Sequence, residues 1–406
     1  MITTINNKHK KLNFSSEREQ SQACLNSAEH EKNQGRKVLN VPNLRFKEFQ
    51  GEWEKTKFGD IATGFDYGMN AAAKNYDGVN KYIRITDIDE ASSTYKDKDI
   101  VSPDGVLADN YLVNNRDILL ARTGASTGKS YLYKKSDGKL YYAGFLIRAN
   151  VTTHDPYFVF SQLHTHRYWR WVSIMSARSG QPGINSQEYS SFPIYTTSIE
   201  EESKIAKLLS LLDERIATQN KIIDNLQSLI KGIAQNIVRN NKPNVRLSEC
   251  LECKSSTLQE SDVCEQGTYP VYGANGIVGY LYNYNTEGEA VYIIKDGSGV
   301  GTVSYVKGKC SATGTLNTLQ AKEGYSLQYL YYLLKVFNFE PYKTGMAIPH
   351  IYFKDYGKAK FFCPSYTEQL QYAQLLSAID NKLSIEQNIL TELTLQKQCL
   401  LRQMFI

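Results

Sequence analysis

Two long stretches of the chain, beginning near Ser198 and Ser365, carry apolar residues that alternate by three and four positions. A mean step of about 3.5 residues is typical of a coiled-coil seam rather than of a general amphipathic helix. Few helix breakers interrupt either stretch, and a Ser or Thr precedes acidic residues at each start. The pattern predicts two long helices, over residues 198–241 and 365–406, each about 60 Å long at a rise of 1.5 Å per residue.

The two stretches are copies of one another, because they align without a gap at an offset of 167 residues. Each seam has one polar residue at the same place, Gln219 in the first copy and Glu386 in the second. We expect an antiparallel coiled coil in which these two residues meet near the middle and help to fix the register. The central seam residues are Leu209, Leu212, Ile216, Gln219 and Ile223, and, in the second copy, Leu376, Ile379, Leu383, Glu386 and Leu390.

A segment rich in Tyr, Gly, Asn and Thr precedes each helix, over residues 41–197 and 242–364. The two segments match weakly but in the same order: RDILLARTGASTGKSYLY (116–133) parallels EAVYIIKDGSGVGTVSYV (289–306). An apolar strand, a glycine turn and a second strand predict β-hairpins. The predicted fold class is α+β: two mixed α/β domains separated by two long helices that form an antiparallel coiled coil, arranged as a pseudo-twofold repeat. Residues 1–40 match neither segment, and we expect a flexible extension there.

Composition narrows the class of protein only slightly. The chain has 406 residues, which is enough for two or three domains, and 47 Lys and Arg against 42 Asp and Glu give a net charge of +5. A weakly basic chain permits nucleic-acid binding without requiring it. The sequence contains no apolar run long enough to span a membrane and no secretory signal, which predicts a cytoplasmic protein.

The loop RTGASTGKS (122–130) resembles a phosphate-binding P-loop but departs from it. A P-loop needs four residues between its first glycine and the Gly-Lys pair, whereas only three separate Gly124 from Gly128. The matching loop, DGSGVGT, has no lysine at the equivalent position, so ATP binding is not expected. Both loops keep a glycine turn after a cation, Arg122 or Lys295. Two interpretations stay open here: backbone amides and the cation approach DNA phosphates or a guanine edge, or the loop is an ordinary solvated hairpin.

Other candidate chemistry is weak. Cys250, Cys253 and Cys264 lack a fourth zinc ligand at a usual spacing, and the seven cysteines favour reduced thiols. The stretch DPYF (155–158) is similar to the Asp-Pro-Pro-Tyr motif of amino-methyltransferases but lacks the second proline.

Two further patterns favour structural roles. Pro103-Asp104 followed by DGK (137–139) is similar to a metal-dependent nuclease pattern that the second half does not repeat. His164 and His166 have no nearby carboxylates at metal-ligand spacing.

From about Val41 to Ile406 the chain resembles the specificity subunits of type I restriction-modification enzymes, in the form found in Gram-positive bacteria. The resemblance lies in VPNLRFKEFQGEWEKTKFGDIA (41–62), YPVYGANGIVGYLYNYN (269–285) and MAIPHI (346–351), together with the two glycine loops and the duplicated helices. Each of these motifs is weak alone, but their doubled order is specific.

The resemblance implies that each globular domain recognises one half of a split, asymmetric DNA site. The helices would set the spacing between the halves and would bind two methylation subunits. Those subunits would bring S-adenosylmethionine, and restriction subunits would bring ATP, magnesium and DNA cleavage. The chain itself would be non-catalytic, with no cofactor and no membrane contact. The alternative hypothesis is a coiled-coil scaffold whose two β-rich domains bind protein.

We expect DNA contacts from cations, amides and hydroxyl groups in loops, because arginine and amide side chains can recognise base edges and lysine and serine can hold phosphates. The candidates are Lys81, Arg84, Arg122, Ser126, Lys129, Arg178, Gln181 and Asn185 in the first domain, and Tyr272, Asn275, Lys295, Ser298, Lys343, His350, Tyr352 and Lys354 in the second.

Overall fold

The computed structural model describes residues 39–177, 182–345 and 347–406. The chain forms two compact units: the first contains the residues up to Ala206 together with 401–406, and the second contains residues 207–400. Most of the predicted N-terminal extension lies outside the described residues.

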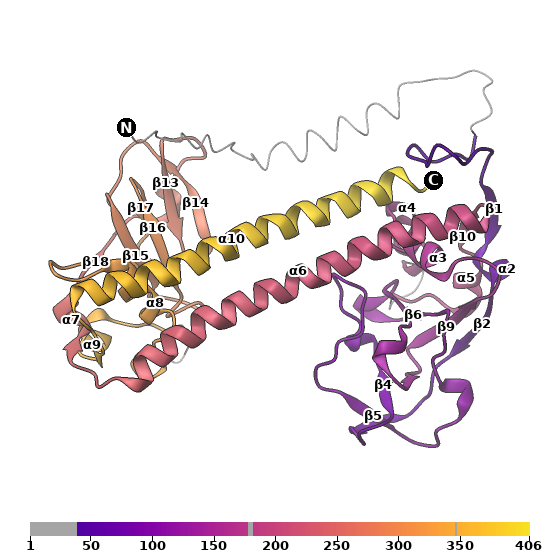
Figure 1. Ribbon diagram of the computed structural model, residues 1–406, viewed down its shortest axis with the longest axis horizontal. Helices are drawn as coiled ribbons and strands as arrows, with labels where there is room; N and C mark the ends of the chain where they lie inside the picture. Colours follow the sequence, from indigo (N-terminus) through magenta and orange to yellow (C-terminus); the bar gives the residue numbers. More distant parts are fainter. Residues whose placement is uncertain (1–38, 178–181, 346) are drawn as a thin grey trace. The chain divides into compact units, whose positions relative to one another are not determined.

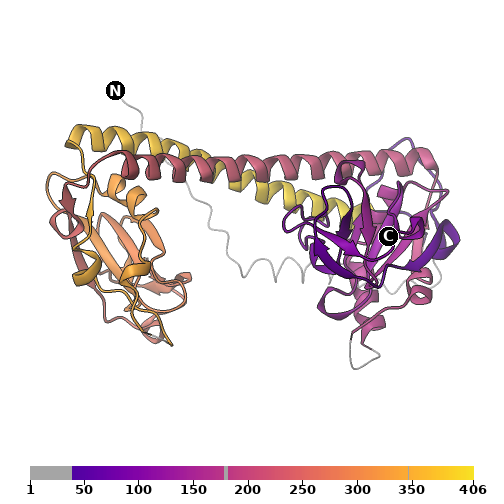
Figure 2. The same ribbon diagram turned by 90° about the horizontal axis from the view of Figure 1, so that it is seen from below.

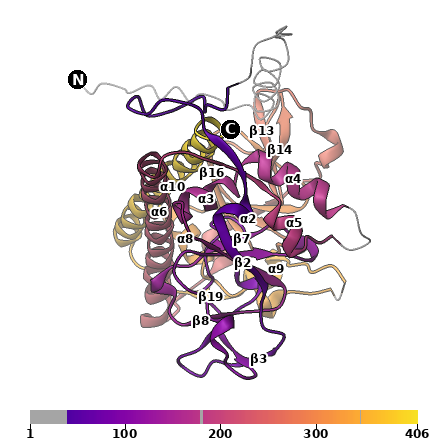
Figure 3. The ribbon, with the colours of Figure 1, turned by 90° about the vertical axis from the view of Figure 1, so that its right-hand side faces the viewer.

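The first unit is built on a four-stranded antiparallel sheet in the order β2-β9-β6-β7, beside smaller two-stranded pairs. Figure 3 shows β2 and α2 as consecutive parts of the indigo ribbon. The strands of the first unit are β1 (Glu54–Lys57), β2 (Ala62–Tyr67), β3 (Ala72–Asn75), β4 (Lys81–Ile83), β5 (Val101–Asp104), β6 (Asp117–Ala121), β7 (Ser130–Leu132), β8 (Leu140–Tyr142), β9 (Leu146–Val151) and β10 (Pro193–Thr196). Its short helices are α2 (Phe58–Ile61), α3 (Pro156–Gln162), α4 (His166–Ser176) and α5 (Ser186–Ser190).

Strand β6 lies at the centre of the first unit, since all five of its residues are buried. The end of the chain also packs into this unit: Phe405 lies 6.1 Å from Trp53 and 5.4 Å from Phe158, measured between ring centroids. Burial of such large aromatic rings contributes strongly to the stability of a small unit.

The second unit repeats this plan. Its antiparallel sheet has the order β12-β18-β15-β16, and a three-stranded sheet β14-β13-β17 lies beside it. The strands are β11 (Val245–Arg246), β12 (Leu251–Ser255), β13 (Tyr269–Gly273), β14 (Gly276–Leu281), β15 (Glu289–Ile294), β16 (Val303–Lys307), β17 (Ser311–Ala312), β18 (Leu316–Ala321) and β19 (Lys360–Phe361). The helices are α7 (Leu247–Cys250), α8 (Leu327–Leu334), α9 (Phe353–Tyr356) and the long α6 (Ile199–Asn240) and α10 (Tyr366–Gln403), of which α6 begins in the first unit and α10 ends there.

Helix α8 lies between the sheet and the long helices of the second unit. Its residue Leu330 belongs to one buried cluster with Ile293 of β15, Ile237 of α6 and Leu376 of α10. Figure 2 shows the orange strands of this unit on one side of the two long helices. The globular part and the helix pair of the second unit therefore share one hydrophobic core.

The long helices run antiparallel along each other (Figure 1). The side-chain Nε2 of Gln219 donates to the main-chain oxygen of Glu386 at 3.0 Å and also to the Glu386 carboxylate. Further along, Lys397 forms an ion pair of 2.6 Å with Asp213. Because Gln219 and Glu386 are equivalent in the repeat, the pseudo-twofold axis that relates the helices passes close to their contact. Together these contacts match the predicted antiparallel coiled coil.

The remaining seam residues are buried to different degrees. Leu209, Leu212, Ile223, Leu376 and Leu383 are buried, whereas Ile216, Ile379 and Leu390 are half-buried.

Candidate nucleic-acid interface

In the first unit the glycine loop packs against the segment that leads into α5. The amide of Gly124 donates to the Pro182 oxygen at 3.0 Å, and the amide of Ile184 donates to the Arg122 oxygen at 3.0 Å. Two of the predicted contact regions are therefore brought together by the fold. Arg178 and Gln181, which belong to the same segment, lie outside the described residues.

The second unit makes the same junction. The amide of Gly297 donates to the Pro349 oxygen at 3.0 Å, and the amide of Ile351 donates to the Lys295 oxygen at 2.9 Å. The isolated bridge between Asp296 and His350 adds to this junction. The loops are thus equivalent in structure, as their sequence order predicted.

The glycine loops are turns between strands and not phosphate-binding loops. A P-loop requires a helix after the loop, but here β7 follows the first loop and β16 the second. In the first loop the amides of Thr127 and Gly128 donate to Gly124 and Ala121, respectively. The amides of Val300 and Gly301 are occupied in the same way in the second. The amides that make these bonds are already occupied, and contacts of the other loop amides and of the loop side chains with DNA stay predictions.

Five of the predicted lysines and arginines are paired with carboxylates, which offsets part of their charge. The pairs are Lys81 with Asp97 (3.2 Å), Arg84 with Asp87 (2.8 Å), Lys129 with Glu90 (3.2 Å), Lys295 with Asp296 (3.9 Å) and Lys343 with Glu340 (2.6 Å). Pairing with a carboxylate can also hold a cation in one orientation, so contact with DNA stays a prediction for these residues.

Two other candidates have structural partners. Asn185 caps α5, since its side chain accepts from the amide of Glu188 at 2.9 Å. Tyr272 packs 5.6 Å from Tyr292, and burial raises its pKa. Capping and packing use part of each side chain, and contact with DNA stays a prediction for both residues.

The remaining candidates lie on exposed or half-exposed parts of the loops. Ser126 ends the short turn Gly124–Ser126 and is half-buried. Asn275 and Ser298 are exposed, and Tyr352 is exposed with Lys354 over its ring at 5.2 Å. These positions are open to a ligand, and their contacts with DNA stay predictions.

Arg122 lies where the strands of the four-stranded sheet end, just beyond the end of β6. This border of the sheet, formed by the ends of β2, β9 and β6, is called its edge below. Its guanidinium lies 4.7 Å from the centroid of the Tyr67 ring, at the end of β2. Its amide donates to the Phe145 oxygen at 3.1 Å, immediately before β9. Hydrogen bonds from Ser186, together with the charge of Arg122, lower the pKa of Tyr67. Three neighbouring strands thus present one arginine and two aromatic rings at the same edge.

A pocket of about 730 Å³ opens at this edge. Its lining includes Tyr67, Arg84, Arg122 and Phe145, together with glycines, alanines and larger residues such as Tyr82, and contains no carboxylate. Tyr67 is 42% exposed and Phe145 is 56% exposed, so both rings can contact a ligand. Sequence analysis missed these two residues. An aromatic residue beside a glycine at a strand end, Tyr67-Gly68 and Gly144-Phe145, was the available signal.

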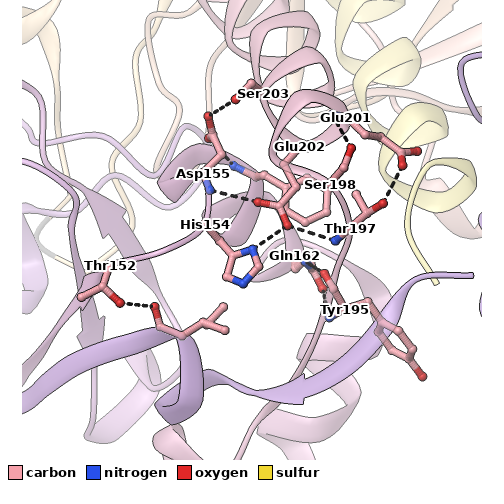
Figure 4. A network of polar contacts seen from close by, with 12 residues as sticks. Thr152, His154, Asp155, Gln162, Tyr195, Thr197, Ser198, Glu201, Glu202 and Ser203 are labelled. Carbon is pink, nitrogen blue, oxygen red and sulfur yellow. Dashed lines mark hydrogen bonds and ion pairs between the residues drawn. The ribbon is translucent and has the colours of Figure 1, made fainter. Parts of the chain in front are cut away.

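The start of α6 is anchored to the first unit by a network of polar side chains (Figure 4). The buried carboxylate of Glu202 accepts from the amides of Asp155 and Thr197, at 3.0 and 3.1 Å. Its contact with Nδ1 of His154, at 2.9 Å, raises the pKa of that histidine. This network fixes the helix to the globular part that precedes it.

The short motifs considered for other chemistry have structural roles. Asp155 of the DPYF stretch caps α3 through the amides of Tyr157 and Phe158. Asp137 accepts from Tyr131 at 2.6 Å, whereas Asp104 pairs with Lys74 at 3.8 Å.

The described residues contain no group of three or more His, Cys, Asp or Glu side chains that could hold a metal ion. In the same part of the chain, no helix combines the length and apolar content that crossing a membrane requires.

The fold defines a class of duplicated chains in which a β-rich globular domain is followed by a long helix, twice over. The family model described as the type I restriction modification DNA specificity domain matches residues 50–228 and 241–395. The chain therefore belongs to this family.

Curated relatives agree with this membership. The EcoprrI specificity subunit of Escherichia coli is 28% identical over 29% of this chain and 29% of the relative. A putative type I specificity subunit of Mycoplasma genitalium is 24% identical over 52% of this chain and 61% of the relative. In both cases the match spans less than two thirds of the relative's own length.

Solved structures share the fold. The crystal structure of a type I restriction-modification S subunit from M. genitalium has a TM-score of 0.64 at 17% identity, covering 90% of this chain and 99% of that one. A structure described as showing complex assembly and conformational transition of the type I R-M system has a TM-score of 0.50 at 14% identity, covering 87% and 97%.

Proposed function

We propose that this chain is the DNA-specificity subunit of a type I restriction-modification complex. Each globular domain would recognise one half of a bipartite, asymmetric double-stranded DNA site. The observation that carries the proposal is the doubling of the four-stranded sheet order, of the glycine-loop junction and of the long helix within a member of this family. Two domains of one plan but different surface residues suit two half-sites of different sequence.

The helix pair would have two roles. At a rise of 1.5 Å per residue, the 42 residues of α6 span about 60 Å, which is comparable to nearly two turns of DNA. A rigid element of this length can set the spacer between the half-sites. Because α6 and α10 are copies of one another, the helix pair has two equivalent surfaces, which suits the binding of two methylation subunits.

Catalysis would belong to the partners. The methylation subunits would supply S-adenosylmethionine, and restriction subunits would supply ATP, magnesium and cleavage, in the cytoplasm where the DNA lies. This chain would contribute recognition alone. The family match favours this hypothesis over a protein-binding scaffold.

The test is to co-express the chain with the methylation subunit of its host and to map methylated adenines by single-molecule sequencing. One split motif should appear, and deletion of either globular domain should abolish it. Binding of a duplex that carries the motif should weaken steeply with added salt, because phosphate contacts release counterions. A complex that forms but methylates no defined motif would argue against the proposal.

A further inference from the structure

The edge of the first sheet presents its side chains in a fixed arrangement. Tyr67 ends β2, Arg122 follows β6, and Phe145 precedes β9, and these strands are neighbours in the order β2-β9-β6. The strands are antiparallel, so these three ends lie at the same edge. The arrangement follows from strand register and not from a flexible loop.

Both main-chain polar groups of Arg122 form hydrogen bonds, which fix its backbone. Its amide donates to Phe145 at 3.1 Å, and its oxygen accepts from Ile184 at 3.0 Å. The hydroxyl of Tyr67, whose ring lies under the guanidinium, accepts from the Ser186 amide at 3.3 Å. An arginine that is fixed before binding loses less conformational entropy when it makes specific hydrogen bonds.

The guanidinium nevertheless has unused hydrogen-bonding capacity. Its Nε–H has no acceptor in the described part of the chain but is buried, so contact with a ligand has to come from the two terminal nitrogens. The second arginine of the pocket, Arg84, is different, because two of its nitrogens donate to Asp87 at 2.8 Å. Arg122 is thus the arginine of this pocket that forms no ion pair with a carboxylate in the described part of the chain.

The groups that line the pocket suit contact with the edges of nucleobases. It combines about 730 Å³ of space, two cations, no carboxylate in its lining and two exposed aromatic rings at its rim. An arginine fork matches the O6 and N7 acceptors of guanine in the major groove, and an exposed aromatic ring can make apolar contact with the edge of a neighbouring base, such as the methyl group of thymine.

We infer that the Tyr67–Arg122–Phe145 edge is the base-recognition site of the first domain, in which Arg122 binds the O6 and N7 atoms of one guanine and Phe145 contacts the neighbouring base. The inference rests on the proposed function and deepens it, because it assigns one base of one half-site to one residue. Tyr67 acts as a positioning residue that holds the guanidinium.

The test uses the full chain in complex with its methylation subunits and duplexes that carry the split motif found by sequencing. Each guanine of both half-sites is replaced in turn by 7-deazaguanine, which lacks the N7 acceptor. With the unmodified protein, one of these replacements should weaken binding about tenfold. The same replacement should have no effect on the Arg122→Gln variant, because the contact is already lost.

Two variants serve as controls. Lys55→Gln removes one exposed positive charge from the same domain, on β1, and should keep the full sensitivity to 7-deazaguanine. Phe145→Ala should weaken binding severalfold while keeping that sensitivity, since the ring contacts a neighbouring base. Unchanged unfolding curves would establish that the variants are folded.

The outcomes are distinct. If a split motif exists but no 7-deazaguanine replacement matters, or if Arg122→Gln keeps the same sensitivity, the inference is overturned and the proposed function survives. A motif without any guanine overturns it equally. If the unmodified complex has no motif at all, the proposed function fails and the inference fails with it.

Discussion

Arg122 in the first domain and Lys295 in the second occupy the same place, one residue beyond the end of equivalent strands β6 and β15. Both are held by the same backbone bonds, from the cation's amide to Phe145 or Thr315 and from Ile184 or Ile351 to the cation's oxygen. Their surroundings differ. Arg122 stacks on Tyr67, whereas Lys295 lies 3.9 Å from Asp296, which contacts His350 at 2.7 Å.

The comparison shows that backbone geometry and surface chemistry are separable in this fold. In the register of the two sheets, Tyr67 and Phe145 of the first correspond to Ser255 and Thr315 of the second. The first edge is aromatic and cationic, and the second carries hydroxyl groups with an acid beside the cation. One scaffold can therefore present different recognition groups while its hydrogen bonds stay the same.

A second pair of equivalent positions differs in charge. Glu202 and Gln369 are 167 residues apart. Each accepts a hydrogen bond from the amide of a residue that caps a shorter helix of the same unit: Asp155 of α3 at 3.0 Å, or Ser326 of α8 at 2.9 Å. Glu202 also contacts His154, whereas Tyr325 stands before Ser326 in the second unit. The contact between the long helix and the globular part, called the helix joint below, thus contains a carboxylate and a histidine in the first unit and a neutral amide in the second.

The largest effect is expected from shortening the helix pair, which the two domains share. Deleting residues 212–218 together with 387–393 removes one heptad from each helix and keeps the seam in phase. The span falls by about 10 Å, so the spacer of the methylated motif should shorten by about three base pairs. Affinity for the original site should fall on the order of a thousandfold.

Single-molecule sequencing of methylated DNA measures this change directly. Both half-site sequences should be unchanged, because the recognition edges are untouched. An unchanged spacer would contradict the proposed role of the helices.

The next effect concerns the recognition edge. Giving the first domain the edge of the second, through Tyr67→Ser, Arg122→Lys and Phe145→Thr, should relax one position of one half-site. The expected loss of discrimination is about 1 to 3 kcal/mol at that position. The motif is again mapped by methylation, with the other half-site as internal control. A change in both half-sites would contradict the assignment of this edge to one half-site.

The helix joint should respond to pH in the first unit. The contact with Glu202 raises the pKa of His154 above its usual 6.5, so its protonated form is favoured by folding. That stabilisation is complete below about pH 6.5 and is lost as pH rises through the raised pKa. Hydrogen exchange of the peptide around Asp155 should accelerate over this range beyond the intrinsic change, whereas the peptide around Ser326 should not.

Glu202→Gln gives the first joint the neutral group of the second. It should cost about 1 to 2 kcal/mol at pH 6, since a charge-assisted hydrogen bond is lost, and should remove the pH dependence. Persistent pH dependence in this variant would show that another group titrates.

The smallest effect is expected at the glycine turns. Gly124 and Gly297 have φ of 67° and 96° with no atom within 4 Å of an added Cβ. Alanine at either position should therefore cost only about 1 kcal/mol of backbone strain, measured by urea unfolding, and leave DNA affinity unchanged. Gly128→Ala should cost more, because its Cβ would lie 2.8 Å from Val172. A large loss of DNA affinity in Gly124→Ala would restore a direct role for the turn.

The repeat, the long helices and the meeting of Gln219 with Glu386 could be predicted from the sequence, because a heptad seam and a constant offset are local or periodic signals. The equivalence of the two glycine loops could also be predicted, whereas the DNA contacts of their residues stay predictions. The helix cap made by Asn185 and the ring contact of Tyr272 were not predicted, because neither role is visible without neighbours in space.

The sequence by itself determined the doubled plan, the antiparallel helix pair and the family, since these depend on periodicity and on the order of motifs. Only the tertiary structure decided which side chains share an edge. Tyr67, Arg122 and Phe145 are separated by 55 and 23 residues in the chain, and strand pairing alone brings them together. Strand register is set by long-range hydrogen bonds and burial, so no local pattern of residues specifies it.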